Sequence, residues 1–236
     1  KTSKSFISYA LNDPDADYTA KNIEFGQDGT YFDVYHKGEK IGTAHLVVPG
    51  KHNVLNALGA IATSQLMEIP INKVLASLEK FTGAKRRFET KGRVNGIWVV
   101  DDYAHHPTEI QVTLAAGKQT KPKRLICVFQ PHRYSRTKLL LKQFATCFKD
   151  ADELILAYIY PASEDPIPGV DTPLLKKTIE ETTGQKVTYL PTFEQIEKYL
   201  VENVKPGDLV MTVGAGDGYR ISEYLVKALE GENKHE

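Results

Sequence analysis

The sequence predicts an α/β protein with a mostly parallel sheet in its second half, and three observations support this prediction. From residue 97 onward, short apolar runs alternate with longer amphipathic segments, which is the pattern of strands joined by helices. Polar and ionisable residues gather directly after several of these runs, where ligands bind in open α/β sheets. Before residue 84 the pattern differs, since a meander of strands leads into two helices. The 236 residues allow one large or two ordinary domains, and this change of pattern favours two.

Composition narrows the class of protein. Lysine plus arginine and aspartate plus glutamate both number 30, which argues against nucleic acid as the main partner. The 41% hydrophobic and 25% charged residues are typical of a soluble globular protein. No apolar run approaches membrane-spanning length, and no secretory signal is visible, so no membrane partner is expected. Cys127 and Cys147 fall in apolar strand and helix patterns, which predicts buried free thiols and a cytoplasmic location.

The first part of the chain predicts a strand meander without a catalytic pattern of its own. Its expected strands are residues 6–9, 18–25, 30–36 and 40–48. Asp28-Gly29 and Lys37-Gly38 supply the turns. Helices are expected over residues 53–67 and 71–81, followed by a linker over residues 82–85.

Two asparagines mark the start of the first helix. Asn53 stands where an N-cap is expected, and Asn56 lies one turn further along on the same face. A cap needs only one of them. The second is either structural or a ligand contact, because an asparagine amide can pair with an adenine edge.

The second part alternates strands and helices. Residues 88–94 and 97–100 flank Asn95-Gly96, which predicts an N-terminal β-hairpin for this part. The further strands are expected over residues 125–129, 154–160, 187–190 and 209–213. The helices are expected over residues 107–119, 136–148, 173–183, 193–203 and 218–230. This alternation predicts a mostly parallel sheet with helices on both faces.

Residues 101–109, Asp-Asp-Tyr-Ala-His-His-Pro-Thr-Glu, follow the strand that begins at residue 97. Pro107 suits the first position of a helix, and Glu109 suits its positive end, so we assign both to capping. Capping does not account for the remaining ionisable residues. We therefore expect Asp101, Asp102, His105 and His106 to include ligand contacts.

The loop after the next strand is basic. Ser135 is a candidate N-cap, which would put Arg136 and Lys138 in the first helical turn, where the helix dipole disfavours cations. Either this loop is simply exposed, or an anionic ligand offsets the repulsion. The glycine-rich residues 214–218 lack the dinucleotide-binding spacing and are explained mostly by tight turning. The proline-rich loop over residues 161–169 is assigned no role.

Several familiar motifs are missing from the sequence. The histidines show no metal-binding spacing, and no nucleophile elbow occurs. No G-x-x-x-x-G-K-[ST] phosphate loop is present in the 236 residues. The pair Arg86-Arg87 is either a solvated face or an anion clamp beside the linker.

Four stretches are distinctive when they are taken together. They are residues 49–57 (Pro-Gly-Lys-His-Asn-Val-Leu-Asn-Ala), 86–89 (Arg-Arg-Phe-Glu), 101–109, and 129–137 (Phe-Gln-Pro-His-Arg-Tyr-Ser-Arg-Thr). Residues 214–217 are a fifth and weaker match. With these stretches the chain resembles the Mur ligases of bacterial cell-wall synthesis. The segment His-Arg-Tyr-Ser-Arg is similar to that of the member that adds alanine.

The resemblance implies a place for this chain within a three-domain enzyme. Residues 1–84 would be the end of a central ATP-binding domain, and residues 85–236 would be a Rossmann-like C-terminal domain that binds the amino acid. The UDP-substrate domain, the phosphate loop and the metal-binding residues would lie upstream of Lys1. On this interpretation the chain is a fragment that is inactive alone, and residues 82–85 form the hinge.

The resemblance also implies the chemistry. ATP and Mg²⁺ would drive ligation of L-alanine to UDP-N-acetylmuramate through an acyl phosphate, in peptidoglycan precursor synthesis. The implied ATP-binding residues are His52, Asn53, Asn56, Arg87 and Asp102. The implied substrate-binding residues are Tyr103, His105, His132, Arg133, Arg136 and Asp217. The implied catalytic residues are Arg87, His105, His132 and Arg136.

Two alternatives to an alanine ligase stay open at this point. In the first, the chain is a non-catalytic Rossmann-like module that binds a nucleotide or an acidic metabolite. In the second, it is part of a related ligase that adds a peptide.

Overall fold

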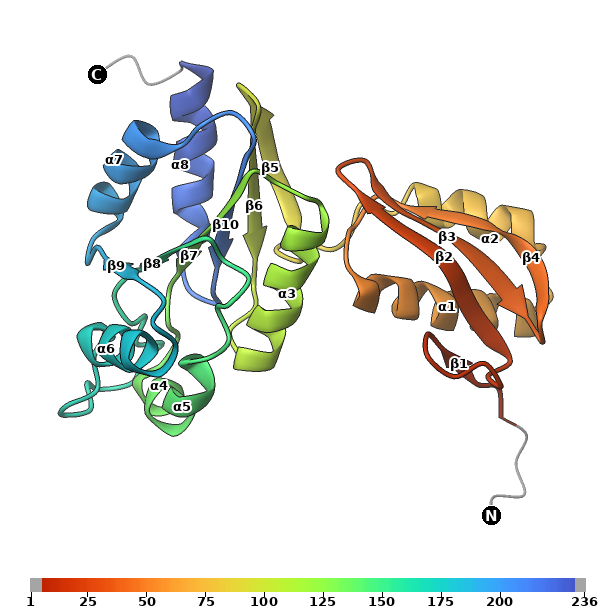
Figure 1. Cartoon of the computed structure of the whole chain (residues 1–236), viewed down its shortest axis with the longest axis horizontal. Helices are drawn as coiled ribbons and strands as arrows, with labels where there is room; N and C mark the ends of the chain where they lie inside the picture. The colour runs from red at the N-terminus through yellow and green to blue at the C-terminus, as the bar shows by residue number, and fades with distance from the viewer. Residues whose placement is uncertain (1–5, 232–236) are drawn as a thin grey trace. The chain divides into compact units, whose positions relative to one another are not determined.

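A computed structural model describes residues 6–231 (Figure 1). It divides the chain into two compact units. Unit 1 comprises Lys1–Gly83 with Gln119–Lys121, and unit 2 comprises Ala84–Lys118 with Pro122–Glu236. No helix within residues 6–231 is long and apolar enough to cross a membrane.

Unit 1 contains a four-stranded sheet and two helices. Its strands, in sheet order, are β1 (Tyr9–Ala10), β2 (Tyr18–Gly26), β3 (Gly29–His36) and β4 (Glu39–Leu46). Strand β1 pairs parallel to β2, and the remaining pairs are antiparallel. The helices are α1 (Lys51–Leu66) and α2 (Ile71–Glu79). They bury Val54, Leu58 and Ile61 of α1 and Val74 of α2 against the sheet, so one sheet face carries the core.

Unit 2 contains a six-stranded sheet in the order β5-β6-β10-β7-β8-β9. The strands are β5 (Glu89–Val94), β6 (Ile97–Asp102), β7 (Arg124–Phe129), β8 (Glu153–Leu156), β9 (Val187–Tyr189) and β10 (Asp208–Val213). Only β5 runs antiparallel, as the outer strand of the hairpin with β6. All other pairings are parallel. The predicted α/β class, the mostly parallel sheet and the hairpin are confirmed.

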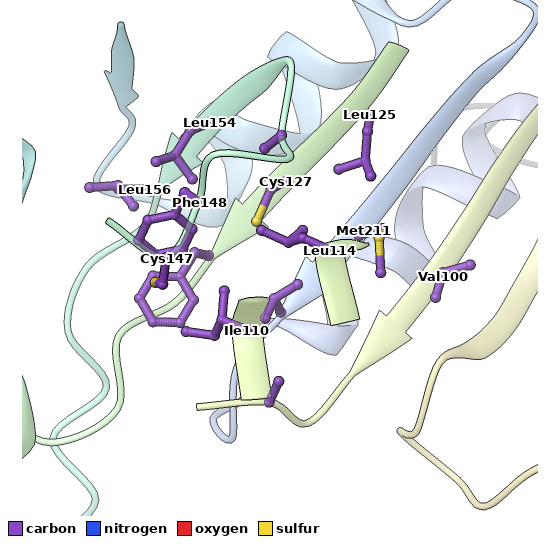
Figure 2. Packing of buried hydrophobic residues seen from close by; sticks show 14 of the residues in the cluster. Val100, Ile110, Leu114, Leu125, Cys127, Cys147, Phe148, Leu154, Leu156 and Met211 are labelled. Atoms are coloured by element: carbon purple, nitrogen blue, oxygen red, sulfur yellow. The ribbon is translucent and has the colours of Figure 1, made fainter. Parts of the chain in front are cut away.

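Helices cover both faces of this sheet. They are α3 (Pro107–Gln119), α4 (Tyr134–Leu139), α5 (Leu141–Phe144), α6 (Thr172–Thr183), α7 (Phe193–Asn203) and α8 (Tyr219–Glu230). Successive strand residues point to opposite faces, so Leu125 and Cys127 pack with α3, whereas Ile126 packs with α7 and α8. Figure 2 shows side chains of the first of these cores, among them Cys127, Leu125 and Met211 of the strands and Leu114 of α3. Parallel strands buried on both faces read as continuous apolar runs, which explains why the sequence predicts them well.

Three element predictions are wrong in part. Residues 136–148 do not form one helix, because the backbone leaves helical geometry at Leu140 between α4 and α5. This break brings Phe144 and Phe148 against Phe129, with ring centroids 5.7 and 5.0 Å away. The strand expected over residues 154–160 ends at Leu156, and the one expected over residues 6–9 is reduced to β1.

The cysteine prediction is confirmed in its main point. Cys127 and Cys147 are both free and fully buried. Burial raises the pKa of both thiols, so they behave as small apolar groups of the core. Cys147 lies in the turn after α5, whereas a helix was expected there.

Candidate functional site

The carboxyl ends of four strands meet at one edge of the unit 2 sheet. Val213 of β10 is in register with Asp102 of β6 and Phe129 of β7, and Phe129 is in register with Leu156 of β8. The loops over residues 103–106, 130–133, 157–171 and 214–218 therefore emerge side by side. This edge is the site that the sequence predicted for ligand binding.

Arg86 connects the end of β6 to the loop after β10 through hydrogen bonds. Its guanidinium donates to the Asp101 carboxylate at 2.8 Å and to the carbonyls of Gly214 at 2.7 Å and Gly216 at 3.1 Å. It also lies over the ring of Tyr103, 4.9 Å from the centroid. Asp101 is 1% exposed and accepts a further bond from Thr212. Arg86 is thus a structural clamp, and both oxygens of Asp101 are bonded to the framework. Its expected part in ligand contacts stays a prediction.

Asp102 is also committed to the framework. Its carboxylate is 5% exposed and accepts hydrogen bonds from the backbone N–H groups of Phe88 and Ala104, each at 2.8 Å. Burial raises its pKa, and these two N–H groups oppose that rise. Asp102 therefore fixes the start of the loop that carries Tyr103 and His105. Its predicted contact with ATP stays a prediction.

Glu109 closes the first turn of α3. Its Oε2 accepts from the N–H groups of His105 and His106 at 3.1 and 3.2 Å. This is the reciprocal half of a capping box, so the predicted capping role is confirmed. Burial would raise the pKa of Glu109, but the two N–H groups and the neighbouring positive charges lower it. The His105 ring meets the Tyr103 ring edge-on, with centroids 5.3 Å apart.

His132 lies next to His105, with ring centroids 6.1 Å apart. Its ring stacks on Tyr160 at 5.5 Å. Arg136 donates through one Nη atom to His132 Nδ1 at 3.1 Å and to its carbonyl at 3.2 Å. Burial, and then the charge of Arg136, lower the pKa of His132 to about 4. His132 is therefore neutral at physiological pH.

The loop over residues 161–169, to which no role was assigned, contributes Glu164. Its carboxylate accepts from the N–H of Ser135 at 2.9 Å and from the Ser135 hydroxyl, and it lies 3.8 Å from Arg133. Helix α4 begins after Arg133, which has a φ of 74° and makes no side-chain cap bond. Glu164 thus caps α4 from another loop. The expectation that Ser135 is the N-cap is wrong, because Ser135 lies inside the first turn.

Asp217 is held by the loop after β7. Gln130 is 1% exposed and donates to Asp217 at 2.8 Å, and it accepts from the N–H of Gly218 at 2.9 Å. The Tyr158 hydroxyl also reaches Asp217, at 3.3 Å. A Cβ atom at Gly216 would lie 2.9 Å from the Tyr160 ring, so this position needs glycine for close approach. Asp217 thus directly follows a glycine that packs against Tyr160, the ring on which His132 stacks.

Arg87 differs from Arg86 in every respect that matters for binding. Its side chain is exposed, and it donates no hydrogen bond to another residue within the range 6–231. Its charge acts on Glu109 and helps to lower the pKa of that carboxyl. Of the predicted pair, Arg87 is therefore the guanidinium that is available to a ligand.

The candidate nucleotide residues of unit 1 stand at the start of α1. Gly50 is the N-cap of α1, and Asn53 lies in the first turn, so the predicted cap at Asn53 is wrong. The Asn53 amide donates to the Pro49 carbonyl at 2.7 Å and accepts from Asn56 at 3.4 Å. His52 is half-buried beside them. The two amides share a face as expected, and Asn56 is exposed.

The sequence predicted that these loops share one sheet edge, but it did not reveal how Arg86, Gln130 and Glu164 organise them. Arg86, Gln130 and Glu164 act on residues far away in the sequence, so spacing did not reveal them. A signal was present for Gln130, because it directly follows a buried strand. No group of three or more His, Cys, Asp or Glu side chains within residues 6–231 could hold a metal ion.

Two family models match the chain. The model described as Mur ligase middle domain matches residues 1–64, and the model described as Mur ligase, glutamate ligase domain matches residues 86–216.

Curated relatives match almost the whole chain. It is 46% identical over 228 residues to the UDP-N-acetylmuramate–L-alanine ligase of Pelotomaculum thermopropionicum, which covers 97% of this chain and 50% of the relative. It is also 46% identical over 222 residues to the ligase of the same name from Clostridium novyi, which covers 94% and 48%. The chain thus spans about half the length of the curated relatives it matches.

Solved structures agree with this picture. The UDP-N-acetylmuramate–alanine ligase of Thermotoga maritima matches 96% of this chain and 48% of its own, at 26% identity and a TM-score of 0.80. A murein peptide ligase of Psychrobacter arcticus matches 94% and 46%, at 29% identity and a TM-score of 0.57. The MurF ligase of Thermotoga maritima in complex with ADP shares the fold, at 18% identity and a TM-score of 0.71.

Proposed function

The chain belongs to the Mur ligase family, as its motifs predicted, and from this premise we propose that it is part of an ATP-dependent ligase that joins L-alanine to UDP-N-acetylmuramate. The product would be a peptidoglycan precursor. Relatives of this name at 46% identity support the choice of substrates. A cytoplasmic location belongs to the same proposal, since the two free cysteines suit a reducing compartment.

One observation carries the proposal: a cluster of cationic and imidazole groups at the strand ends of unit 2. Tyr103, His105 and His132 form a continuous series of ring contacts, and Arg136 is bonded to the last of them. A guanidinium recognises a carboxylate through two parallel hydrogen bonds, and it also stabilises charge on a reacting oxygen. The cluster therefore suits an amino acid whose carboxylate is held while its amine reacts.

We assign the amino acid to Tyr103, His105, His132, Arg133 and Arg136, with Asp217 beside them. Arg136 is the main carboxylate partner in this assignment, because His132 holds its guanidinium in place. Arg133 is more exposed and shares its charge with Glu164. The Tyr103 side chain is 39% exposed and lies against His105, so it can limit the size of the side chain that fits.

We assign ATP to His52, Asn53 and Asn56 of unit 1, and to Arg87 and Asp102 of unit 2. The exposed Arg87 would meet phosphate oxygens, and the exposed Asn56 amide would meet the adenine. Asp102 would contribute by holding its loop, because both of its oxygens already accept bonds. The family is ATP-dependent, but residues 6–231 contain no group of three or more His, Cys, Asp or Glu side chains that could hold a metal ion, so no step is derived through Mg²⁺.

The proposed chemistry has two steps. The muramate carboxylate attacks the γ-phosphorus of ATP and forms an acyl phosphate, with ADP as the leaving group. The alanine amine then attacks the acyl carbon, and the C–O bond to phosphate breaks. Cationic groups are needed in both steps because anions are brought together and negative charge develops on the acyl oxygen. Arg87, His105, His132 and Arg136 are the groups that we assign to this task.

The test is substrate-dependent ADP release by the full-length enzyme that carries this chain. With UDP-N-acetylmuramate present, L-alanine should stimulate release, and a tripeptide should not. Stimulation by the tripeptide would instead assign a peptide-adding ligase. Nucleotide binding without turnover under any of these conditions would assign a non-catalytic module. Residues 1–236 alone should release no ADP in response to alanine.

Arg136→Ala should raise the KM for alanine by about 10–100-fold, the effect of losing a hydrogen bond to a charged group. Lys138→Ala is the matched control, because Lys138 is an exposed cation of the same helix α4. Equal kinetics for Arg136→Ala and the wild type would remove Arg136 from the site.

A further inference from the structure

We infer that His105 and His132 are held in opposite neutral tautomers, so that the site presents an acceptor nitrogen from one ring and a donor N–H from the other. Different protein partners impose the two tautomers. The catalytic use that we assign to these tautomers rests on the proposed function, whereas the tautomers themselves do not depend on it.

His132 is the donor. A guanidinium can donate hydrogen bonds but cannot accept them, so the Arg136 contact at 3.1 Å requires a lone pair on His132 Nδ1. The ring proton of the neutral imidazole then lies on Nε2. The same Arg136 nitrogen bonds the His132 carbonyl, and Tyr160 stacks on the ring, so the ring cannot easily flip. Its low pKa, which results first from burial and then from Arg136, keeps it neutral above about pH 5.

His105 is the acceptor. Its Nδ1 lies 3.0 Å from the Tyr103 carbonyl, which can only accept, so Nδ1 carries the proton. Glu109 Oε2, 3.7 Å from the same nitrogen, adds a negative charge on that side. The neutral ring therefore has its lone pair on Nε2, and that atom bonds no other residue in the part of the chain that the structure describes.

The groups around His105 suit it as a proton acceptor. Glu109 faces it from α3, Tyr103 from its own loop and His132 from the loop after β7. Glu109 is ionised at neutral pH, because the N–H groups that it caps lower its pKa despite burial, and it stabilises the imidazolium that forms. Neutral His132 adds no opposing charge, so protonation of His105 meets no cationic ring beside it.

These tautomers divide the work at the reacting amine. An amino acid arrives as an ammonium ion, which cannot attack. His105 Nε2 takes one proton, and the neutral amine then attacks the acyl carbon of the acyl phosphate. The amide forms, the second proton leaves with hydrogen phosphate, and His105 returns its proton to water. His132 Nε2–H donates to an anionic oxygen of the substrate throughout, without changing its own protonation.

The tautomers can be read directly in the 236-residue chain. Long-range ¹H–¹⁵N correlation spectra distinguish the two ring nitrogens of each of the 7 histidines. His105→Gln and His132→Gln each remove one set of signals and so assign them. At pH 7 we expect protonated Nδ1 for His105 and protonated Nε2 for His132. The same tautomer in both rings, or the reverse pair, would overturn the inference.

Kinetics of the full-length enzyme test the division of roles. Glutamine has an amide that can donate a hydrogen bond but cannot take a proton. His105→Gln should therefore lower kcat about 10²–10⁴-fold at neutral pH, with partial recovery at high pH, where free amine is available. His132→Gln should stay within about 10-fold of wild type, whereas His132→Leu should lose about 10²–10³-fold. His36→Gln is the control, since His36 ends β3 in unit 1 and is assigned to neither substrate.

The outcomes separate this inference from the proposed function. A His105→Gln enzyme that keeps the acidic limb of its pH profile would refute the proton-acceptor role, while ligation itself would stand. Absence of alanine ligation in the wild type would refute the proposed function and, with it, both catalytic roles, whereas the spectra would still decide the tautomers.

Discussion

The polar groups at the sheet edge of unit 2 and those at the start of α1 in unit 1 are built in different ways. At the sheet edge, Asp102 and Gln130 are buried and fully bonded to the backbone and side chains around them. At the start of α1, Asn53 and Asn56 bond one another and a single carbonyl, and Asn56 is exposed. The first region is therefore a frame that carries the groups that we propose to bind ligand. The second consists of proposed ligand-binding groups on a helix whose folding does not depend on them.

This difference predicts which substitutions affect stability and site geometry together. Removing a buried polar group leaves its partners unpaired in a low dielectric, so stability and site geometry suffer together. Removing an exposed polar group leaves only water to be rearranged. Trp98, the single tryptophan of the chain, lies in β6 and so reports on unit 2, which allows the contrast to be measured.

Asp102→Ala should show the largest loss. This change leaves the N–H groups of Phe88 and Ala104 without an acceptor, and unit 2 should lose about 2–4 kcal/mol of unfolding free energy. Urea unfolding followed by Trp98 fluorescence measures this loss. Asp102→Asn, which keeps one acceptor oxygen, should lose about half as much. An unchanged urea midpoint for Asp102→Ala would mean that the buried hydrogen bonds of Asp102 do not stabilise this sheet edge.

Arg86→Ala and Arg87→Ala should differ although the residues are neighbours. Arg86→Ala leaves the buried Asp101 carboxylate and two carbonyls without their hydrogen-bond donor, and it should lower the unfolding free energy of unit 2 by about 1.5–3 kcal/mol. The second removes an exposed side chain and should stay within about 0.5 kcal/mol. The same fluorescence measurement decides between them. Equal losses would contradict the separate roles assigned to the two arginines.

His132 should make unit 2 less stable in acid. Its pKa is about 4 in the folded state and 6.5 ordinarily, so between these values the unfolded chain binds more protons. The unfolding free energy should therefore fall as the pH drops from 6.5 to 4, and His132 should contribute no slope above that window. The difference between wild type and His132→Gln across this range isolates the effect. Parallel curves for the two proteins would place the His132 ring in water.

Asn53→Ala and Asn56→Ala should have the smallest effect on folding, within about 0.5 kcal/mol for Asn56, because its side chain is exposed. Far-UV circular dichroism during urea unfolding is the measurement. In the full-length enzyme the same changes should weaken ATP binding, which calorimetry can detect. A large stability loss without a change in ATP binding would make this pair structural.

The fold could be predicted wherever burial decides the residue types. The bounds of α3 and α7 match the expected ranges, and the apolar runs of β7 and β10 mark the centre of the sheet. Helix 136–148 was mispredicted because its apolar spacing does not show the break at Leu140. Tertiary packing of Phe144 and Phe148 against Phe129 decides it.

Some residues of the candidate site could likewise be predicted from the sequence, and others could not. Half-buried groups such as Arg136 and His105 could be proposed from their loops, because strand ends gather at one edge. Arg86, Gln130 and Glu164 could not, because their partners lie 15 to 130, 87 to 88 and 29 residues away. Local spacing carries no signal for contacts at such separations. The opposite tautomers of His105 and His132 depend on their bonding partners, so they too needed coordinates.

The central place of β10 has a consequence for the order in which unit 2 folds. Among the strands within residues 6–231 it is the last in sequence, yet it pairs with both β6 and β7. During synthesis, the two strands emerge long before the strand that joins them, so each waits with an unpaired edge. The six-stranded sheet is completed at its middle only after its other five strands have been made, and the high sequence separation of these contacts predicts slow folding. A growing chain thus has no finished sheet edge in unit 2 until residues 208–213 have been made.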